Sequence, residues 1–124
     1  MGREKKEIGN LGEKIAREFL EAKGYRVMSK NFRTPFGELD MIARHGGSIV
    51  FVEVRTRTTS SFGPPSLSVT RIKQMHLIKN ALFYLKGCGR IDSDWRIDVV
   101  SVKLSHDRKL EKIEHIENAV EEIY

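Results

Sequence analysis

The sequence has few of the residues that crosslink a chain or break its regular structure. It holds one cysteine, Cys88, so no disulfide can form within these 124 residues, and it holds only three prolines. No apolar run approaches the roughly 20 residues that span a bilayer. The N-terminal segment carries too many charges for a signal peptide. We therefore expect one domain over residues 1–124, cytoplasmic and without membrane association.

Acidic residues are scarce in the middle of the chain. Between residues 23 and 90 there are 12 lysines and arginines but three acids, Glu38, Asp40 and Glu53, although the net charge of the whole chain is +5. Such a segment attracts a polyanion, because it neutralises phosphates and releases their counterions. On charge alone, an ordinary solvated surface is an equal alternative.

Hydrophobic periodicity predicts an α/β fold, a mixed sheet flanked by helices in the order α-β-β-β-α-β-β. The predicted helices cover residues 5–23 and 70–86, with a short closing helix at 118–123. The predicted strands cover residues 25–32, 39–44, 48–57, 95–104 and 110–116. In the second helix we expect one buried stripe: Ile72, Met75, Ile78 or Leu77, Leu82 and Leu85.

A glycine pair, Gly46-Gly47, predicts a hairpin turn between the second and third strands. With this turn, Ile42 faces Phe51 and Asp40 faces Glu53. The same register adds Glu38 and Arg55 to a polar cluster on one face, and it predicts an apolar set on the other: Leu39, Met41, Val52 and Val54.

Two carboxylates that face each other across a sheet destabilise it unless something compensates for their repulsion. A proton, a basic side chain or a divalent cation can do so. Carboxylate oxygens with water are the ligands that Mg²⁺ or Mn²⁺ prefers, and such an ion can polarise a phosphodiester and lower the pKa of a bound water. The alternative is a surface ion-pair cluster that uses Arg55 and Arg57.

Five segments of the chain resemble, in the same order, the uncharacterised bacterial YraN family: Gly12-Glu13, Asn31-Phe32-Arg33, Gly37-Glu38-Leu39-Asp40, Phe51-Val52-Glu53-Val54-Arg55 and Arg96-Ile97-Asp98-Val99-Val100. The similarity runs from Asn10 to Ala119. That family is predicted to be nuclease-like and distantly similar to archaeal Holliday-junction resolvases. The resemblance therefore implies a restriction-endonuclease-like fold and a metal-dependent endonuclease acting on branched or damaged DNA, with DNA favoured over RNA and a homodimer as a further hypothesis.

The resemblance also implies roles for individual residues. The nuclease signature is an Asp followed by Glu-x-Lys on the next strand, which Asp40 and Glu53 match. Both are then catalytic ligands of Mg²⁺ or Mn²⁺, completed by the backbone carbonyl of Val54 and by Glu13 from the first helix. Without the family, Glu13 is an ordinary solvated helix glutamate. Glu38 either contacts these ligand residues without binding the ion itself or pairs with Arg55.

The chain departs from the signature at Arg55, which stands where the family of nucleases has lysine. Arginine can grip a phosphate and stabilise charge in the transition state, but it does not act as a general base. Either a metal ion activates the attacking water, or another lysine substitutes, or the activity is weak or lost. Lys73 on the second helix is the substitute to test first, although a solvated helix lysine is an equal alternative. If activity is lost, the chain is a nuclease-like module that binds nucleic acid.

Several further residues are candidates for contact with phosphates: Lys30, Arg33, Arg57, Lys73 and Gln74. The four histidines are scattered and lack the spacing of metal ligands. For Asp98, at the start of its strand motif, we expect a structural role.

Overall fold

The computed structural model describes residues 2–58 and 70–120. It contains α1 (Gly2–Ala22), β1 (Arg26–Thr34), β2 (Gly37–His45), β3 (Ser48–Thr58), α2 (Arg71–Gly87), β4 (Trp95–Leu104) and β5 (Leu110–Ile116). The predicted order α-β-β-β-α-β-β is confirmed. Of the helices described, neither is both long and apolar enough to cross a bilayer.

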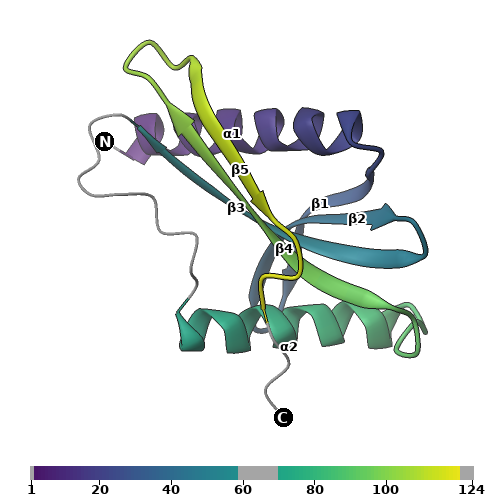
Figure 1. Cartoon of the computed structure of the whole chain (residues 1–124). Coiled ribbons are helices and arrows are strands. Elements are labelled where there is room, and N and C mark those ends of the chain that lie inside the picture. The colour runs from purple at the N-terminus through teal and green to yellow at the C-terminus, as the bar shows by residue number, and fades with distance from the viewer. Residues whose placement is uncertain (1, 59–69, 121–124) are drawn as a thin grey trace.

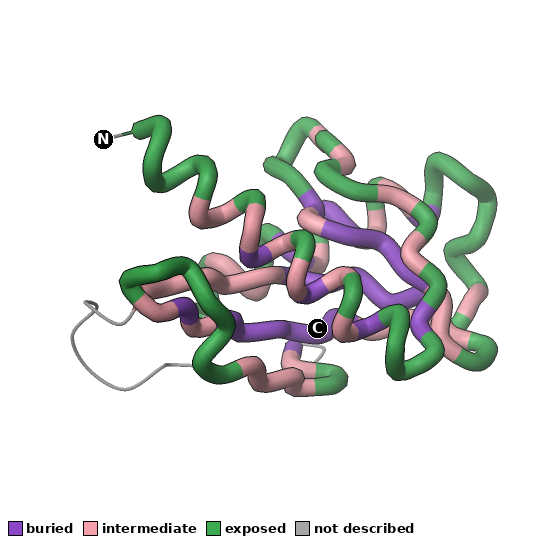
Figure 2. Tube along the Cα trace, turned by 90° about the horizontal axis from the view of Figure 1, so that it is seen from above, coloured by how far each residue is buried: buried purple, intermediate pink, exposed green. Residues whose placement is uncertain are grey.

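The strands form one mixed sheet whose order is the order of the chain, β1 to β5. Neighbouring strands are antiparallel except β3 and β4, which are parallel. Figure 1 shows α1 lying across one face of the sheet and α2 across the other. Both faces of the central strands are therefore covered, and the sheet carries the most deeply buried part of the chain (Figure 2).

Each helix packs on its own apolar cluster. The cluster under α2 includes Leu77 and Leu85 of the helix with Ile42, Phe51 and Val99 of the sheet. The cluster under α1 includes Ala16 and Leu20 of the helix with Met41, Val52 and Val102 of the sheet. The two helices thus cover the sheet from opposite sides.

The hairpin register is the one that Gly46-Gly47 predicts, because Ile42 pairs with Phe51 and His45 pairs with Ser48. The predicted apolar face is wrong at one position. Leu39 packs in the cluster under α2, whereas Met41 packs in the cluster under α1. Strict alternation of side chains along β2 therefore does not hold between these two residues.

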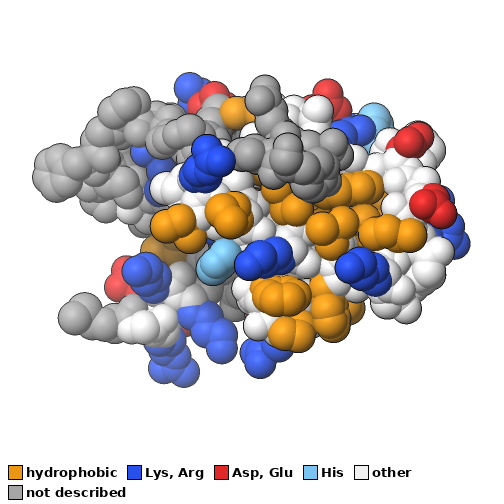
Figure 3. Space-filling model, turned by 90° about the horizontal axis from the view of Figure 1, so that it is seen from below, with side chains coloured by type: hydrophobic (Ala, Val, Ile, Leu, Met, Phe, Trp, Pro, Cys, Tyr) orange, Lys and Arg blue, Asp and Glu red, His pale blue; other side chains and the backbone are white. Residues whose placement is uncertain are grey.

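The predicted stripe of the second helix is also partly wrong. Ile72 and Met75 are exposed, with 70% and 47% of their surface accessible, and the buried side of α2 carries Leu77, Asn80, Ala81 and Leu85. The helix has apolar residues on several sides, so its periodicity does not select one face. Figure 3 shows the face of the molecule on which α2 lies, where apolar side chains are exposed among basic ones.

The closing helix expected at residues 118–123 is absent over its described part, residues 118–120, and its remainder lies outside the described residues. The backbone N–H of Asn118 donates to the Asp98 carboxylate at 3.0 Å, and the N–H of Ala119 donates to the carbonyl of Ile97 at 2.7 Å. Because β4 already satisfies these donors, the segment packs against the sheet instead of coiling.

Candidate functional site

Asp40 lies where the β2–β3 ladder ends. The last paired residues on this side are Met41 and Val52, so Asp40 and Glu53 do not form the ladder pair that we expected. Instead, the Val54 N–H donates to Asp40 Oδ2 at 2.8 Å, and the carboxyl groups of Asp40 and Glu53 share a hydrogen bond. The register therefore brings the two acids together, although through their side chains and not through backbone pairing.

The environment of this pair disfavours two negative charges. Burial, followed by the charge of Glu53, raises the pKa of Asp40 from its ordinary 3.8 to about 8, and only the Val54 N–H lowers it appreciably. Glu53 is itself buried, with 9% of its surface accessible. In the absence of a cation the pair retains a proton at neutral pH, which is one of the remedies anticipated for facing carboxylates.

Glu13 approaches the same region from α1. The residue before it, Gly12, lies against Thr56 of β3 so closely that a Cβ at Gly12 would stand 1.8 Å from Thr56 Oγ1. This contact lets the helix backbone touch the sheet. Burial, then the charges of Glu38 and Glu53, raise the pKa of Glu13. The charge of Glu13 in turn raises the pKa of Asp40, so Glu13, Asp40 and Glu53 act on one another electrostatically.

Lys73 reaches the pair from the other side of the sheet. Its Nζ lies 3.2 Å from Glu53 Oε2. The first turn of α2 holds the lysine there, because Thr70 caps the helix by accepting the Lys73 N–H on its hydroxyl at 3.2 Å. The structure thus places a lysine amine beside the acid that precedes Arg55 in the signature.

The backbone of Val54 also faces this region. Its N–H points to Asp40, and the N–H and C=O of one strand residue point to the same edge of the strand. The Val54 carbonyl therefore points from β3 toward the side on which β2 diverges. Such an oxygen is a suitable donor for a cation held between Asp40 and Glu53.

The remaining predicted site residues surround the acids less closely. Glu38 forms an ion pair with Arg33, with 3.8 Å between Oε2 and Nε, across the β1–β2 ladder. Arg55 and Arg57 follow Glu53 at alternate positions of β3, so all three belong to one side of that strand. Two further candidates lie nearby: Gln74, partly buried on α2, and Lys30, exposed on β1 and close enough to lower the pKa of Glu13.

A second cluster of chemically active groups lies on β4 and β5. Asp98, His115 and Glu117 each bring a ligand atom within 4.8 Å of the others, so they could hold a metal ion. Among the residues that the structure describes, no other three His, Cys, Asp or Glu side chains come this close together. Glu13, Asp40 and Glu53 are thus more widely spaced as a trio.

The second cluster already contains a positively charged side chain, that of Arg96. Arg96 Nε donates to Asp98 Oδ1 at 3.0 Å. The Tyr25 hydroxyl donates to Asp98 Oδ2 at 3.2 Å, and His115 Nε2 is hydrogen-bonded to the same oxygen at 2.8 Å. Asp98 is fully buried, and these partners satisfy it. The contacts favour a structural role, in which the carboxylate ties the start of β1 to β4 and β5.

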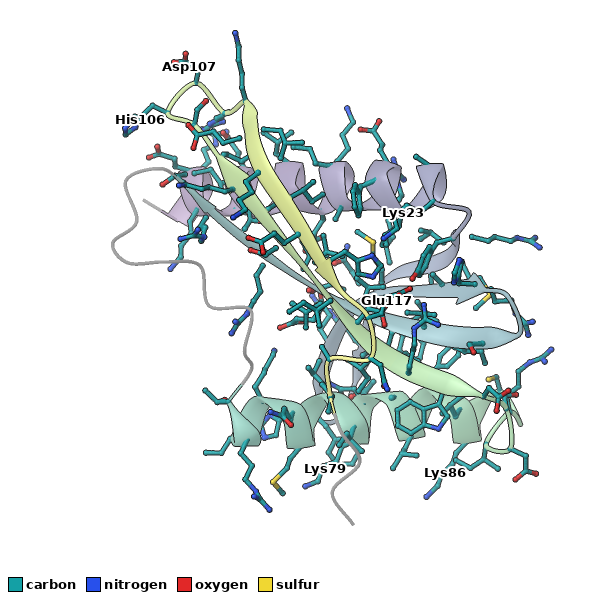
Figure 4. The ribbon with its side chains drawn as sticks, in the orientation of Figure 1. Lys23, Lys79, Lys86, His106, Asp107 and Glu117 are labelled. Carbon is teal, nitrogen blue, oxygen red and sulfur yellow. The ribbon has the colours of Figure 1, made fainter. Side chains whose placement is uncertain are left out.

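The sequence analysis missed this cluster, because it sought histidine spacings within one segment. His115 pairs with Val100, two residues beyond Asp98, on the neighbouring strand, so their spacing of 17 residues carries no local signal. Figure 4 labels two exposed side chains at its margin, Lys23 and Glu117. Lys23 Nζ lies 2.7 Å from His115 Nδ1.

Comparison with known proteins identifies relatives over nearly the whole chain. Residues 12–102 match the model of the uncharacterised protein family UPF0102. A UPF0102 protein of Geobacter metallireducens is 44% identical over 119 residues, which cover 96% of each chain. One from Thermodesulfovibrio yellowstonii is 47% identical over 91% of this chain and 95% of its own. A third, from Pelobacter propionicus, is 48% identical over 94% of this chain and 84% of its own.

Proposed function

The chain belongs to the uncharacterised, YraN-like protein family UPF0102, and from this premise we propose that it is a Mg²⁺- or Mn²⁺-dependent endonuclease that hydrolyses phosphodiester bonds in DNA. The family name states no activity, so the proposal stands on the site. The observation that carries it is the geometry at the end of the β2–β3 ladder, where Asp40 Oδ2 accepts the Val54 N–H at 2.8 Å and Glu53 Oε2 lies 3.2 Å from Lys73 Nζ.

The donor set fits a hard divalent cation. Asp40, Glu53 and Glu13 offer carboxylate oxygens, and Val54 offers a backbone oxygen at the same place. A proton now relieves the repulsion between Asp40 and Glu53, and a divalent cation would relieve it more completely. The wider spacing of the three acids leaves room for water among the ligands, as Mg²⁺ usually requires. When bound, the ion would supply Lewis-acid stabilisation of the phosphodiester.

The basic side chains around the acids have separable tasks. Lys73 contacts Glu53 and is the group that we assign to the task of the signature lysine, which is to hold and move a proton of the attacking water. Arg55 keeps its charge and is assigned to the scissile phosphate. Arg57, Arg33 and Lys30, with Gln74, would hold the flanking backbone without reading base sequence.

A second function has one observation in its favour, namely arginine at the lysine position of the signature. Under this alternative the domain binds nucleic acid and does not cut it. Metal binding separates the two functions, because a binding module has no need of a cation between Asp40 and Glu53. If the chain is an enzyme, calorimetric titration should detect binding of Mn²⁺ to the wild type. Asp40→Asn and Glu53→Gln should each abolish this binding.

The direct test is incubation of the purified protein with four-way, nicked and linear DNA in Mn²⁺ or Mg²⁺. We expect strand cleavage that EDTA stops and that Asp40→Asn lowers about 100-fold or more. Asp107→Asn makes the same chemical change on an exposed loop between β4 and β5 (Figure 4) and should leave cleavage unchanged. Cleavage that is absent on every substrate, or that persists in Asp40→Asn, would overturn the nuclease proposal.

Three parts of the proposal concern the setting of the reaction. A preference for DNA over RNA is tested by comparing cleavage of DNA and RNA substrates in the same assay. A symmetric homodimer suits a junction with two equivalent strands, and analytical ultracentrifugation with and without a four-way junction tests it. A cytoplasmic location is proposed together with the nucleic-acid substrate, and fractionation of cells that express a tagged chain tests it.

A further inference from the structure

A hollow of about 280 Å³ lies between the middle of α1 and strand β1. Six residues line it: Asn10, Glu13, Lys14, Arg17, Lys30 and Asn31. Of these, only Glu13 and Lys30 belong to the site described above. We call this hollow the α1–β1 pocket. The nuclease signature does not point to this pocket, because Asn10, Lys14, Arg17 and Asn31 are not part of that signature.

The lining of the α1–β1 pocket has a net positive charge, which favours binding of an anion. Lys14, Arg17 and Lys30 bring three positive charges against the single negative charge of Glu13. Within the described part of the chain, the buried Nε of Arg17 has no hydrogen-bond partner. The Arg17 guanidinium therefore keeps a donor that the protein itself does not use, and a ligand that reached this donor would satisfy it.

The pocket is continuous with the acidic site through Glu13. This residue lines the pocket, and the charges of Glu38 and Glu53 on one side and of Lys30 on the other all act on it. In the β1–β2 ladder Lys30 pairs with Met41 and Phe32 pairs with Leu39, so Asn31 of the pocket lies opposite Asp40. A ligand in the pocket therefore lies next to the acidic site.

The shape and polarity of the pocket narrow the class of ligand. No aromatic ring is among the described residues that line it, so it provides no platform on which a base could stack. Its volume is slightly below the roughly 300–1,000 Å³ typical of pockets for drug-sized ligands. Carboxamides from Asn10 and Asn31 accompany the cations and can bond sugar or ester oxygens.

A second hollow adjoins the α1–β1 pocket. It has a volume of about 210 Å³, shares Arg17 and Lys30 with the pocket and continues along β1 past Val27, Met28 and Ser29, and Glu21 of α1 also lines it. Two cations thus stand at the junction of two successive hollows. A linear polymer with regularly spaced negative charges fits such a track better than a compact anion does.

We propose that the α1–β1 pocket binds a sugar–phosphate unit of the substrate strand, one that lies next to the phosphodiester held at Asp40 and Glu53. This inference rests on the proposed nuclease function and adds the place where the uncut part of the strand is held. Lys14, Arg17 and Lys30 bind the phosphate, and Asn10 and Asn31 bind the sugar side. Recognition is of the backbone and is independent of sequence.

The first experiment measures binding of fluorescent four-way and linear DNA by anisotropy in EDTA, where no cleavage occurs. The pocket variant is Lys14→Gln with Arg17→Gln. The matched control is Lys79→Gln with Lys86→Gln, which removes the same charge from the outer side of α2 (Figure 4). We expect the pocket variant to bind about tenfold more weakly and to reduce the slope of log affinity against log salt by about one, whereas the control changes both little.

Equal losses in the two double variants would overturn the proposal, because they would show a general effect of net charge. Wild-type affinity in the pocket variant would overturn it as well. Circular dichroism checks that the variants fold. If Arg17→Gln prevents folding, the exposed single change Lys14→Gln is compared with Lys86→Gln by the same salt slope.

The second experiment observes the pocket directly. In nitrogen-15 NMR spectra of the wild-type chain, the Arg17 Nε–H resonance should shift on titration with deoxyribose 5-phosphate, and much less with deoxyribose. A shift with inorganic phosphate of the same size would reduce the ligand to a phosphate alone and contradict the sugar contact. No shift with any of these probes would overturn the pocket.

Failure of this inference is distinguishable from failure of the nuclease proposal. The pocket variant keeps Asp40, Glu53 and Glu13, so it should bind Mn²⁺ in calorimetry as the wild type does. Normal Mn²⁺ binding with unchanged DNA affinity would refute the pocket and leave the nuclease intact. If the wild type does not bind Mn²⁺, the nuclease proposal is refuted, whatever the pocket binds.

Discussion

Replacing Asp40 by asparagine should make the metal-free protein more stable, and this gain should grow with pH. Burial and the neighbouring Glu53 raise the pKa of Asp40 from 3.8 to about 8. Between these values the folded protein holds a proton that the unfolded chain has released. Its free energy of unfolding therefore falls as the pH rises through this window, and the fall ends near pH 8. Asparagine is neutral at every pH and escapes this penalty.

The size of the gain follows from the same pKa. A carboxyl whose pKa moves from 3.8 to about 8 on folding loses at most about 5–6 kcal/mol of stability. The ion pair of Lys73 with Glu53, at 3.2 Å, already offsets part of the repulsion. We therefore expect Asp40→Asn to gain about 2 kcal/mol at pH 7.5 and less than about 1 kcal/mol at pH 5. The Val54 N–H still finds an acceptor in the new side chain.

The assay is urea denaturation in EDTA at both pH values. At pH 7.5 the gain corresponds to a rise of about 6–10 °C in Tm. Added Mn²⁺ should reverse the order, because an ion that binds only the folded wild type stabilises it by about 2.7 kcal/mol at a hundredfold excess over Kd. Asp107→Asn, on an exposed loop, should change stability by less than about 0.5 kcal/mol. A variant that is less stable than wild type at both pH values would refute the reasoning.

Three other substitutions test the packing and the chemistry around the site. Gly12→Ala should lower the free energy of unfolding by about 1–3 kcal/mol in urea denaturation, because its Cβ would stand 1.8 Å from Thr56 Oγ1. Asp98→Asn should lower it by about 3–5 kcal/mol in the same assay, because the Arg96 charge would lose its buried partner at 3.0 Å. Lys73→Met should slow cleavage about 100-fold without weakening Mn²⁺ binding in calorimetry, because it removes a cation and leaves the acids.

Matched controls accompany these three changes. Gly9→Ala, in the same helix but with nothing within 4 Å of the added Cβ, should stabilise the protein by about 0.5–1 kcal/mol. Glu117→Gln removes an exposed neighbour of Asp98 and should be tolerated. Lys79→Met should cleave normally. Stability losses of equal size at Gly9 and Gly12, tolerance of Asp98→Asn, or equal cleavage by the two lysine variants would each contradict the assigned role.

The hairpin shows how far local patterns reach. Two glycines and the strand period predict the pairing of Ile42 with Phe51, which the structure confirms. They do not predict that the ladder stops at Met41, so that Asp40 turns to accept the Val54 N–H. The twist of the sheet decides where two strands part, and a period of two residues contains no information on twist.

The second helix shows the opposite case. Its apolar residues surround much of the helix, so its sequence does not select a buried face, and Ile72 is exposed although a stripe through it was expected. The contact of Lys73 with Glu53 depends on the face that packs. The lysine could be named from the sequence as the substitute to test, but only packing of α2 on the sheet brought its amine to 3.2 Å from the acid.

What the sequence determined by itself is the order of elements, the hairpin register and the family. These depend on residues close together in the chain or on motifs kept in a fixed order. What the tertiary structure decided is which side chains meet across elements: Glu13 with Glu53, Tyr25 and His115 with Asp98, and Arg17 with Lys30 around a pocket. The physical reason is that spacing along a strand or helix sets directions within that element, whereas distances between elements follow from how two helices pack on a twisted sheet.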